Sequence, residues 1–273
     1  MSKGELLAQG RTGEVYAWGE SEILKLYLPG FPVYDVDHEY AISRLVHDHG
    51  IPTPYAMSRV EIDDRHGIVF ERLTGRTMLH LMAADPMAVP AMARNLAELH
   101  YQIHQIRAAG FPSRKRGLRR QIQSTAQLTG DEKSSILSAL DALPDDSHLC
   151  HGDFHPDNVL IADGRPSIID WMTGSAGSPA SDVVRSCIIF MTATPPPGAP
   201  VAVEDLRTLL KRTLYREYLT RYLSLSGMGI TELEQWLLPV AAARLAEGLP
   251  EVEKEQLLNT IRSKMAGEDV LAI

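Results

Sequence analysis

The stretch that decides the fold reads His-Gly-Asp-Phe-His-Pro-Asp-Asn-Val-Leu-Ile at residues 151–161, followed by Ser-Ile-Ile-Asp-Trp at residues 167–171. Two short apolar runs on either side of an Asp-Gly-Arg-Pro turn predict a β-hairpin. Asn158 opens its first strand and Asp170 closes its second, so antiparallel pairing brings both to one end. An amide oxygen and a carboxylate that converge there predict a Mg²⁺ site, because Mg²⁺ prefers hard oxygen ligands.

A third oxygen-bearing side chain, Asp153, lies five residues before Asn158 on the connecting loop. Phosphoryl transfer needs a carboxylate that accepts the proton of the acceptor hydroxyl, and metal ligands that neutralise phosphate charge. The spacing Asp-x-x-x-x-Asn, with a later Asp after a hairpin, matches the catalytic loop of kinases and their magnesium-binding Asp. We therefore predict Asp153 as the catalytic carboxylate and Asn158 and Asp170 as metal ligands.

With this His-Gly-Asp loop the sequence resembles the aminoglycoside phosphotransferase and choline kinase-like family, from about residue 7 to about residue 190. The resemblance implies an α+β, bilobal, protein-kinase-like fold with ATP as the phosphate donor. Its small N-terminal lobe is β-rich with one helix, and its larger C-terminal lobe is mostly helical. No Ala-Pro-Glu activation segment follows Asp170, which favours a small-molecule acceptor over a protein. Asp182 resembles the buried Asp that braces the catalytic loop in this family.

Hydrophobic periodicity predicts the secondary structure around this loop. We expect strands at residues 14–18, 23–28, 57–61 and 67–70. We expect a helix at residues 37–49 with Asp37 as its N-cap, and further helices at residues 92–106, 116–128, 133–143, 203–224, 231–246 and 251–265. A loop is expected at residues 194–198. A change of composition near residues 73–75 predicts a nucleotide-binding lobe at residues 1–73 and a helical lobe with the catalytic loop and acceptor pocket at residues 74–273.

Two charged residues stand among apolar neighbours in the N-terminal part. Lys25 lies on a strand whose two faces are mostly apolar, and Glu39 lies along the apolar stripe formed by Ile42 and Val46. Buried ions need partners, so we expect Lys25 to pair with Glu39 and to hold the α- and β-phosphates of the nucleotide. The alternative is that both side chains lie exposed at the edges of their elements.

The remaining nucleotide contacts are expected from two short segments. The Gly10-Arg11-Thr12-Gly13 turn would cover the phosphates, with Gly10, Thr12 and Gly13 as the contributing residues. By resemblance, residues 70–73 form the hinge between lobes, and the Glu71 carbonyl and the Leu73 amide hydrogen-bond adenine.

Composition excludes several classes of protein. The 273 residues are 44% hydrophobic and 23% charged, which is typical of a globular protein rather than a disordered or fibrous chain. The net charge of −8 argues against general nucleic-acid affinity. We find neither a signal peptide nor an apolar stretch that could span a bilayer, so we expect a cytoplasmic protein without a membrane partner.

Two alternatives to a kinase stay open. One is a kinase-fold protein that binds nucleotide without transferring phosphate. The other is a zinc hydrolase that uses His151, Asp153 and His155, which alternate along the chain. His100 and His104 share a helix face, but Tyr101 replaces the Glu of a metalloprotease motif, so we interpret them as packing residues.

The acceptor is not identified by the sequence. Four acidic residues near the C-terminus would suit a cationic acceptor such as an aminoglycoside or choline, or would form a solvated face: Glu247, Glu251, Glu253 and Glu255. Ethanolamine, homoserine, thiamine and sugar hydroxyls also stay open as acceptors.

Overall fold

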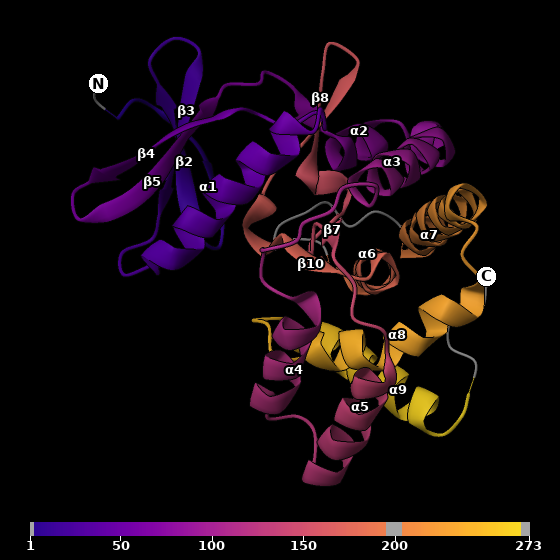
Figure 1. Cartoon of the computed structure of the whole chain (residues 1–273). Coiled ribbons are helices and arrows are strands. Elements are labelled where there is room, and N and C mark those ends of the chain that lie inside the picture. The colour runs from indigo at the N-terminus through magenta and orange to yellow at the C-terminus, as the bar shows by residue number, and fades with distance from the viewer. Residues whose placement is uncertain (1–2, 195–203, 269–273) are drawn as a thin grey trace. The chain divides into compact units, whose positions relative to one another are not determined.

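The computed structural model describes residues 3–194 and 204–268 (Figure 1). Contacts divide the chain into two compact units, Met1–Leu81 with Pro156–Gly174, and Met82–His155 with Ser175–Ile273. This division differs from the expected one at residue 73, because the short strand β6 (Arg76–Thr77) pairs with β8 (Val159–Ala162) and joins the hairpin to the first unit.

The first unit is built on a five-stranded antiparallel sheet in the order β1-β2-β3-β5-β4. The strands are β1 (Leu6–Gln9), β2 (Gly13–Trp18), β3 (Glu22–Tyr27), β4 (Ala56–Ile62) and β5 (Arg65–Glu71). The four predicted strands are confirmed. The fifth, β1, is an edge strand whose side chains are all exposed, so it carries no apolar alternation by which it could be recognised.

The alternation of side chains along β3 separates two apolar clusters. Leu24 and Leu26 pack with Trp18 on one face of the sheet. Tyr27 packs on the other face with Val36, which comes from helix α1 (Val33–Asp48). Lys25 projects from the same face as Tyr27, because side chains two residues apart in a strand share a face. The sheet therefore carries Lys25 toward α1.

Helix α1 begins four residues earlier than expected. Its N-cap is Pro32, with φ −61°, and the helix starts at Val33, so the predicted cap Asp37 is wrong. The fixed φ of proline suits entry into a first helical turn, which explains the earlier start. Asp37 lies within the helix and forms an ion pair with Arg59 on β4. The buried stripe of α1 includes Glu39, as expected.

The predicted hairpin is formed by β8 (Val159–Ala162) and β9 (Arg165–Ile168). Val159 pairs with Ile168, and the Ile169 amide donates to the Asn158 carbonyl at 3.0 Å. Asn158 thus directly precedes one strand, and Asp170 follows the other by two residues. Both lie at the same end of the hairpin, which confirms the expectation from their spacing.

The second unit is mostly helical, in agreement with the predicted fold class. Helix α2 (Met78–Ala84) leads into it from the first unit. The other helices are α3 (Val89–Ile103), α4 (Arg114–Ser124), α5 (Gly130–Ala142), α6 (Pro179–Thr192), α7 (Glu204–Ser226), α8 (Ile230–Arg244) and α9 (Glu251–Met265). Two short strands pair beside them, β7 (His148–Cys150) and β10 (Ser175–Gly177). Helix α3 packs on α7, and α6 packs on α8 (Figure 1).

Helix α6 was not predicted as a separate element. It is buried at nearly every position, polar side chains such as Asp182 and Arg185 included, so it lacks the exposed polar face that surface helices have. The loop expected at residues 194–198 lies outside the described residues except for Thr194. No helix in the described ranges is long and apolar enough to cross a membrane.

Candidate active site

In the first unit, Lys25 lies between two carboxylates. Its Nζ donates to Oε1 and Oε2 of Glu39 at 2.7 and 2.9 Å, and to Oδ1 of Asp170 at 2.9 Å. The predicted Lys25–Glu39 pair is therefore confirmed. The contact with Asp170 ties the sheet to the end of the hairpin within the same unit.

The ion pair of Lys25 and Glu39 is largely buried. The Glu39 side chain is 2% exposed, and the Tyr27 hydroxyl donates to its Oε2 at 2.5 Å. Burial raises the pKa of Glu39 and also raises the pKa of Tyr27, which keeps the phenol protonated as a donor. Burial alone would lower the pKa of Lys25, but the negative charges of Glu39 and Asp170 outweigh it and raise that pKa. Lys25 is a fixed cation at this position.

The end of the hairpin presents oxygen ligands. Asp170 has φ 63°, a left-handed conformation that few residues other than glycine adopt. Its side chain is 41% exposed, whereas Asn158 is buried. A carboxylate and an amide oxygen form the hard-oxygen donor set that Mg²⁺ prefers, so the residues present fit that ion. Their role as metal ligands stays a prediction.

The glycine turn before β2 is held against β3. The Gly10 amide donates to the Gly13 carbonyl at 2.9 Å, and the Leu28 amide donates to the Thr12 carbonyl at 3.0 Å. A Cβ added at Gly13 would lie 2.6 Å from the backbone oxygen of Leu26, so this position requires glycine. The predicted phosphate contacts of Gly10, Thr12 and Gly13 stay a prediction.

The predicted hinge follows the last strand of the sheet. Glu71 is the exposed last residue of β5, and the Arg72 amide donates to the Ser21 carbonyl at 2.9 Å. This bond fixes the backbone between Glu71 and Leu73. The proposed adenine contacts of these two residues stay a prediction.

In the second unit, the loop that carries Asp153 is held by Asp182 of α6. The carboxylate of Asp182 accepts the backbone amide of His151 at 2.6 Å and that of Gly152 at 2.9 Å. Gly152 has φ 80°, which suits glycine. The expectation that Asp182 braces this loop is therefore confirmed.

Two histidines and two tyrosines complete what we call the Asp182 cluster. Nε2 of His100 lies 3.0 Å and Nε2 of His104 lies 3.4 Å from Oδ2 of Asp182. Nδ1 of His100 lies 2.6 Å from the Tyr218 hydroxyl, and Nδ1 of His104 lies 2.6 Å from the Tyr222 hydroxyl. Since a carboxylate only accepts, each Nε2 must donate to Asp182 and each Nδ1 accepts from a tyrosine.

The charges within the Asp182 cluster follow from its burial. Burial lowers the pKa of His100 to about 3 and lowers the pKa of His104 as well, so both rings are neutral at pH 7. Burial alone would raise the pKa of Asp182, but the hydrogen bonds from both histidines hold it well below its usual range. The cluster therefore contains two neutral imidazoles and one carboxylate anion, and this anion holds the loop backbone in place.

The zinc alternative at His151, Asp153 and His155 finds no support in the described part of the chain. Within the described residues, one group of His, Cys, Asp or Glu side chains lies close enough together to hold a metal ion. It consists of His100, His104 and Asp182, and does not include His151, Asp153 or His155. The three side chains of that group are already saturated by their hydrogen bonds to one another, to tyrosines and to backbone amides. The prediction that His100 and His104 are packing residues agrees with this.

Asp153 itself is held by a residue that the sequence did not point to. Its Oδ1 lies 3.1 Å from Nη2 of Arg185, and its Oδ2 lies 3.4 Å from Nε2 of His155. Burial alone would raise the pKa of Asp153, but His155 and Arg185 hold it well below its usual range. One signal was present: Arg185 lies between the apolar pairs Val183-Val184 and Ile188-Ile189 of α6, and a buried arginine needs a carboxylate.

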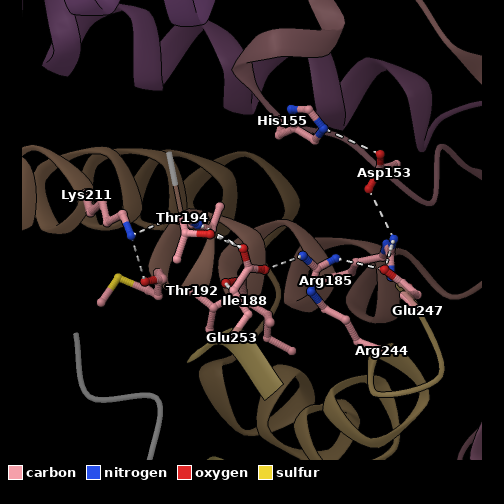
Figure 2. A network of polar contacts seen from close by, with 12 residues as sticks. Asp153, His155, Arg185, Ile188, Thr192, Thr194, Lys211, Arg244, Glu247 and Glu253 are labelled. Carbon is pink, nitrogen blue, oxygen red and sulfur yellow. Dashed lines mark hydrogen bonds and ion pairs between the residues drawn. The ribbon is translucent and has the colours of Figure 1, made fainter. Parts of the chain in front are cut away.

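The acidic residues near the C-terminus are less available than expected. Glu247 accepts from Arg185 at 2.5 Å and from Arg244 at 3.1 Å (Figure 2). Glu253 is buried, and its Oε2 lies 3.4 Å from Nη2 of Arg244. Two of the four carboxylates considered for a cationic acceptor are therefore already paired with arginines, and the other two are exposed.

Comparisons with known proteins identify chains that share this fold. Among solved structures, an aminoglycoside-3'-phosphotransferase of type VIII matches with a TM-score of 0.61 and 19% identity, over 89% of this chain and 90% of the other. An amicoumacin kinase in complex with AMP-PNP, Ca²⁺ and Ami matches with a TM-score of 0.66 and 14% identity, over 97% and 88%. A choline/ethanolamine kinase family protein from Mesorhizobium loti matches with a TM-score of 0.60 and 17% identity, over 96% and 80%.

At these identities the solved structures show the fold alone, which is kinase-like as predicted. A search of curated proteins finds no match. The sequence model of the phosphotransferase enzyme family matches residues 3–219, which is most of the chain. The chain belongs to the phosphotransferase enzyme family.

Proposed function

We propose that this protein is a kinase that transfers the γ-phosphate of ATP to a hydroxyl group of a small molecule. Membership of the family supports phosphoryl transfer. The observation that carries the proposal is the Lys25 ammonium, which donates to Glu39 on one side and to Asp170 on the other. A lysine anchored by a helix glutamate beside a metal-binding aspartate is the arrangement that grips a nucleotide in kinases.

The first unit would bind the nucleotide. Lys25 would hold the α- and β-phosphates while Glu39 keeps its ammonium in place. The glycine turn at residues 10–13 would cover the phosphates, and the backbone at residues 71–73 would receive adenine. Asn158 and Asp170 would hold Mg²⁺, which when bound neutralises charge on the β- and γ-phosphates.

Asp153 would act on the acceptor. Its carboxylate orients the acceptor hydroxyl and receives the hydroxyl proton as the oxygen bonds to the γ-phosphorus and the bond to ADP breaks. A pKa well below the usual range makes Asp153 a weak base. That suits a loose transition state, in which positioning contributes more than early proton removal.

The acceptor class is a small hydroxyl compound. The names of the similar solved structures include aminoglycoside, amicoumacin and choline/ethanolamine kinases, which supports this class without choosing a member. The pairing of Glu247 with Arg185 and Arg244 removes one expected contact for a cationic group. Neutral acceptors therefore belong in the first screen together with amines.

The test is a screen of purified protein with Mg-ATP, and in parallel Mg-GTP, against aminoglycosides, choline, ethanolamine, homoserine, thiamine and sugars. We expect ADP and a phosphorylated product in equal amounts with at least one acceptor, and mass spectrometry identifies the product. Binding of Mg-ATP without product from any acceptor would favour the silent nucleotide-binding protein. Failure to bind either nucleotide would overturn the proposal.

A further inference from the structure

We propose that Arg185 is a positioning residue that fixes the carboxylate of Asp153, and that Glu247 in turn fixes Arg185. This inference rests on the proposed function, in which Asp153 receives the proton of the acceptor hydroxyl. It assigns a role to Arg185 of α6 and to Glu247 of the segment after α8. No sequence motif identifies either residue.

The guanidinium of Arg185 lies between two carboxylates. Its Nη2 is 3.1 Å from Oδ1 of Asp153, and its Nη1 is 2.5 Å from Oε1 of Glu247 (Figure 2). The same Nη2 lies 3.4 Å from Oε2 of Glu247. Because the guanidinium is planar, a carboxylate that grips one edge also sets the direction of the nitrogen that reaches Asp153. Glu247 therefore determines where Arg185 can hold Asp153.

The contact is sheltered from solvent. The side chains of Arg185, Glu247 and Asp153 are 9%, 17% and 22% exposed. Charges in such a setting are screened less than surface pairs. Arg185 also projects from a helix that is buried at nearly every position, whereas Asp153 lies on an irregular loop. The helix therefore fixes the position of Arg185, and Arg185 in turn holds Asp153 on the loop.

Further contacts hold Glu247 from the other side. Nη1 of Arg244 lies 3.1 Å from its Oε2, and Nη2 of Arg244 lies 3.4 Å from Oε2 of Glu253 on α9. Glu253 also accepts from the backbone amide and hydroxyl of Thr194 at 2.9 and 2.8 Å. Charges alternate from Asp153 to α9, and Figure 2 shows this series of contacts. Arg185 is therefore part of an extended network of ion pairs rather than an isolated packing residue.

The charge on Asp153 depends on several elements of the second unit. The groups that act on it come from its own loop, from α6 and from α8: His151, His155, Arg185 and Arg244. Arg114 on α4 acts in turn on Arg185. Because burial alone would raise the pKa of Asp153, loss of Arg185 leaves a carboxylate that protonates at higher pH. A protonated Asp153 cannot accept the hydroxyl proton, so activity should fail first on the acidic side.

The first experiment compares Arg185→Met, Arg185→Lys and Glu247→Gln with wild type, using the acceptor from the screen. We expect Arg185→Met to lower kcat roughly 100-fold, the effect of a small misplacement of a reacting group. The KM for ATP should change less than about threefold. An acidic limb should enter the pH profile of kcat/KM, and Arg185→Lys should restore part of the rate. Glu247→Gln should show a smaller loss of the same kind.

A control variant removes an arginine–glutamate ion pair elsewhere in the second unit. Arg221 of α7 forms an ion pair with Glu98 at 2.6 Å, is more exposed than Arg185, and takes no part in the proposed catalytic or binding site. Arg221→Met should leave kcat and the pH profile unchanged. Wild-type kcat and an unaltered pH profile in Arg185→Met, or in Glu247→Gln if the first variant does not fold, would overturn the role of Arg185.

A second readout does not need catalysis. In protein labelled with carbon-13 at aspartate, the Asp153 carboxyl signal is assigned from its loss in Asp153→Asn and then titrated. We expect its pKa to be higher in Arg185→Met than in wild type, with Arg185→Lys in between. Equal titration in all three would overturn the inference even if transfer occurs. Absence of product in wild type, with the titration as expected, would overturn only the proposed function.

Discussion

Lys25 and Asp170 are 145 positions apart in the sequence, yet Nζ of Lys25 lies 2.9 Å from Oδ1 of Asp170. The contact joins the third strand of the sheet to the end of the β8–β9 hairpin within one compact unit. The same ammonium is held by Glu39 on α1. The proposed phosphate-binding cation, Lys25, and a proposed metal ligand, Asp170, are thus in direct contact.

Replacing Lys25 should damage nucleotide binding. Lys25→Met removes the cation that would hold two phosphates, and charge-assisted hydrogen bonds contribute about 1.5–3 kcal/mol each. We expect kcat/KM for ATP to fall roughly 10- to 100-fold, which steady-state kinetics and calorimetric titration with Mg-ATP would detect. Lys254→Met, which removes a lysine–glutamate contact of 2.6 Å on α9, is the control and should leave ATP binding unchanged. Equal ATP affinity in wild type and Lys25→Met would contradict the phosphate role.

Asp170→Asn should raise the Mg²⁺ concentration that the reaction requires. The substitution keeps the size of the side chain but removes the charge that would attract the ion. We expect the Mg²⁺ concentration for half-maximal activity to rise by roughly tenfold or more. Asp163 is the matched control, because it lies in the turn of the same hairpin, is exposed, and has a similar left-handed φ of 49°. A rise in Asp163→Asn equal to that in Asp170→Asn would show that hairpin geometry, not metal binding, is responsible.

The sequence predicted the parts of the site that depend on local spacing. Asn158 and Asp170 flank two short apolar runs, and antiparallel pairing fixes them at one end of the hairpin. Lys25 and Glu39 were identified because each interrupts an apolar face and needs a partner of opposite charge. In each case the period of the element, two residues in a strand and 3.6 in a helix, determines which face the side chain occupies. A charged side chain on a buried face then needs a partner of opposite charge.

Contacts between distant segments could not be predicted in this way. Nothing near Arg185 in the sequence indicates that its partners are Asp153 and Glu247, which are 32 and 62 positions away. Helix α6 buries its polar side chains Asp182 and Arg185 together with its apolar ones, which sequence alone does not indicate. The start of α1 does not follow from Asp37, the residue type that favours an N-cap, because the proline at position 32 already permits the first turn.

The two glycines of the turn before β2 should respond differently to substitution. A Cβ at Gly13 would lie 2.6 Å from the Leu26 oxygen, whereas a Cβ at Gly10 would meet nothing closer than 3.8 Å. We expect Gly13→Ala to lower the free energy of unfolding by about 1–3 kcal/mol, because backbone atoms must move. Gly10→Ala should stay within about 0.5 kcal/mol of wild type. Urea unfolding measures both, and equal losses would contradict the close approach of β2 to β3.

His100 should make the fold sensitive to acid. An unfolded imidazole takes up a proton near pH 6.5, whereas burial keeps His100 neutral down to a pKa of about 3. Between these values the unfolded state binds more protons, so this contribution is complete above pH 6.5 and is lost as the pH falls toward about 3. We expect a slope of about 1.4 kcal/mol per pH unit from His100, to which His104 adds in the same direction.

Unfolding free energies measured between about pH 7 and about pH 5 test this slope. His100→Asn removes the titrating group and should give a shallower dependence whatever its stability at neutral pH. His47→Asn, which changes an exposed histidine on α1, should keep the wild-type slope. The same pH dependence in His100→Asn and wild type would mean that the buried histidine does not control acid stability.

The rate of γ-phosphate transfer to the acceptor in Asp153→Asn, at saturating Mg-ATP, tests the proposed mechanism most directly. Asparagine keeps the size of the side chain but can neither orient the acceptor hydroxyl as a carboxylate does nor take its proton, and a positioned group of this kind contributes roughly 100- to 10,000-fold. We expect transfer to fall by at least that lower factor while Mg-ATP still binds as it does to wild type. Wild-type transfer by Asp153→Asn would contradict the role given to Asp153 and, with it, the proposed chemistry.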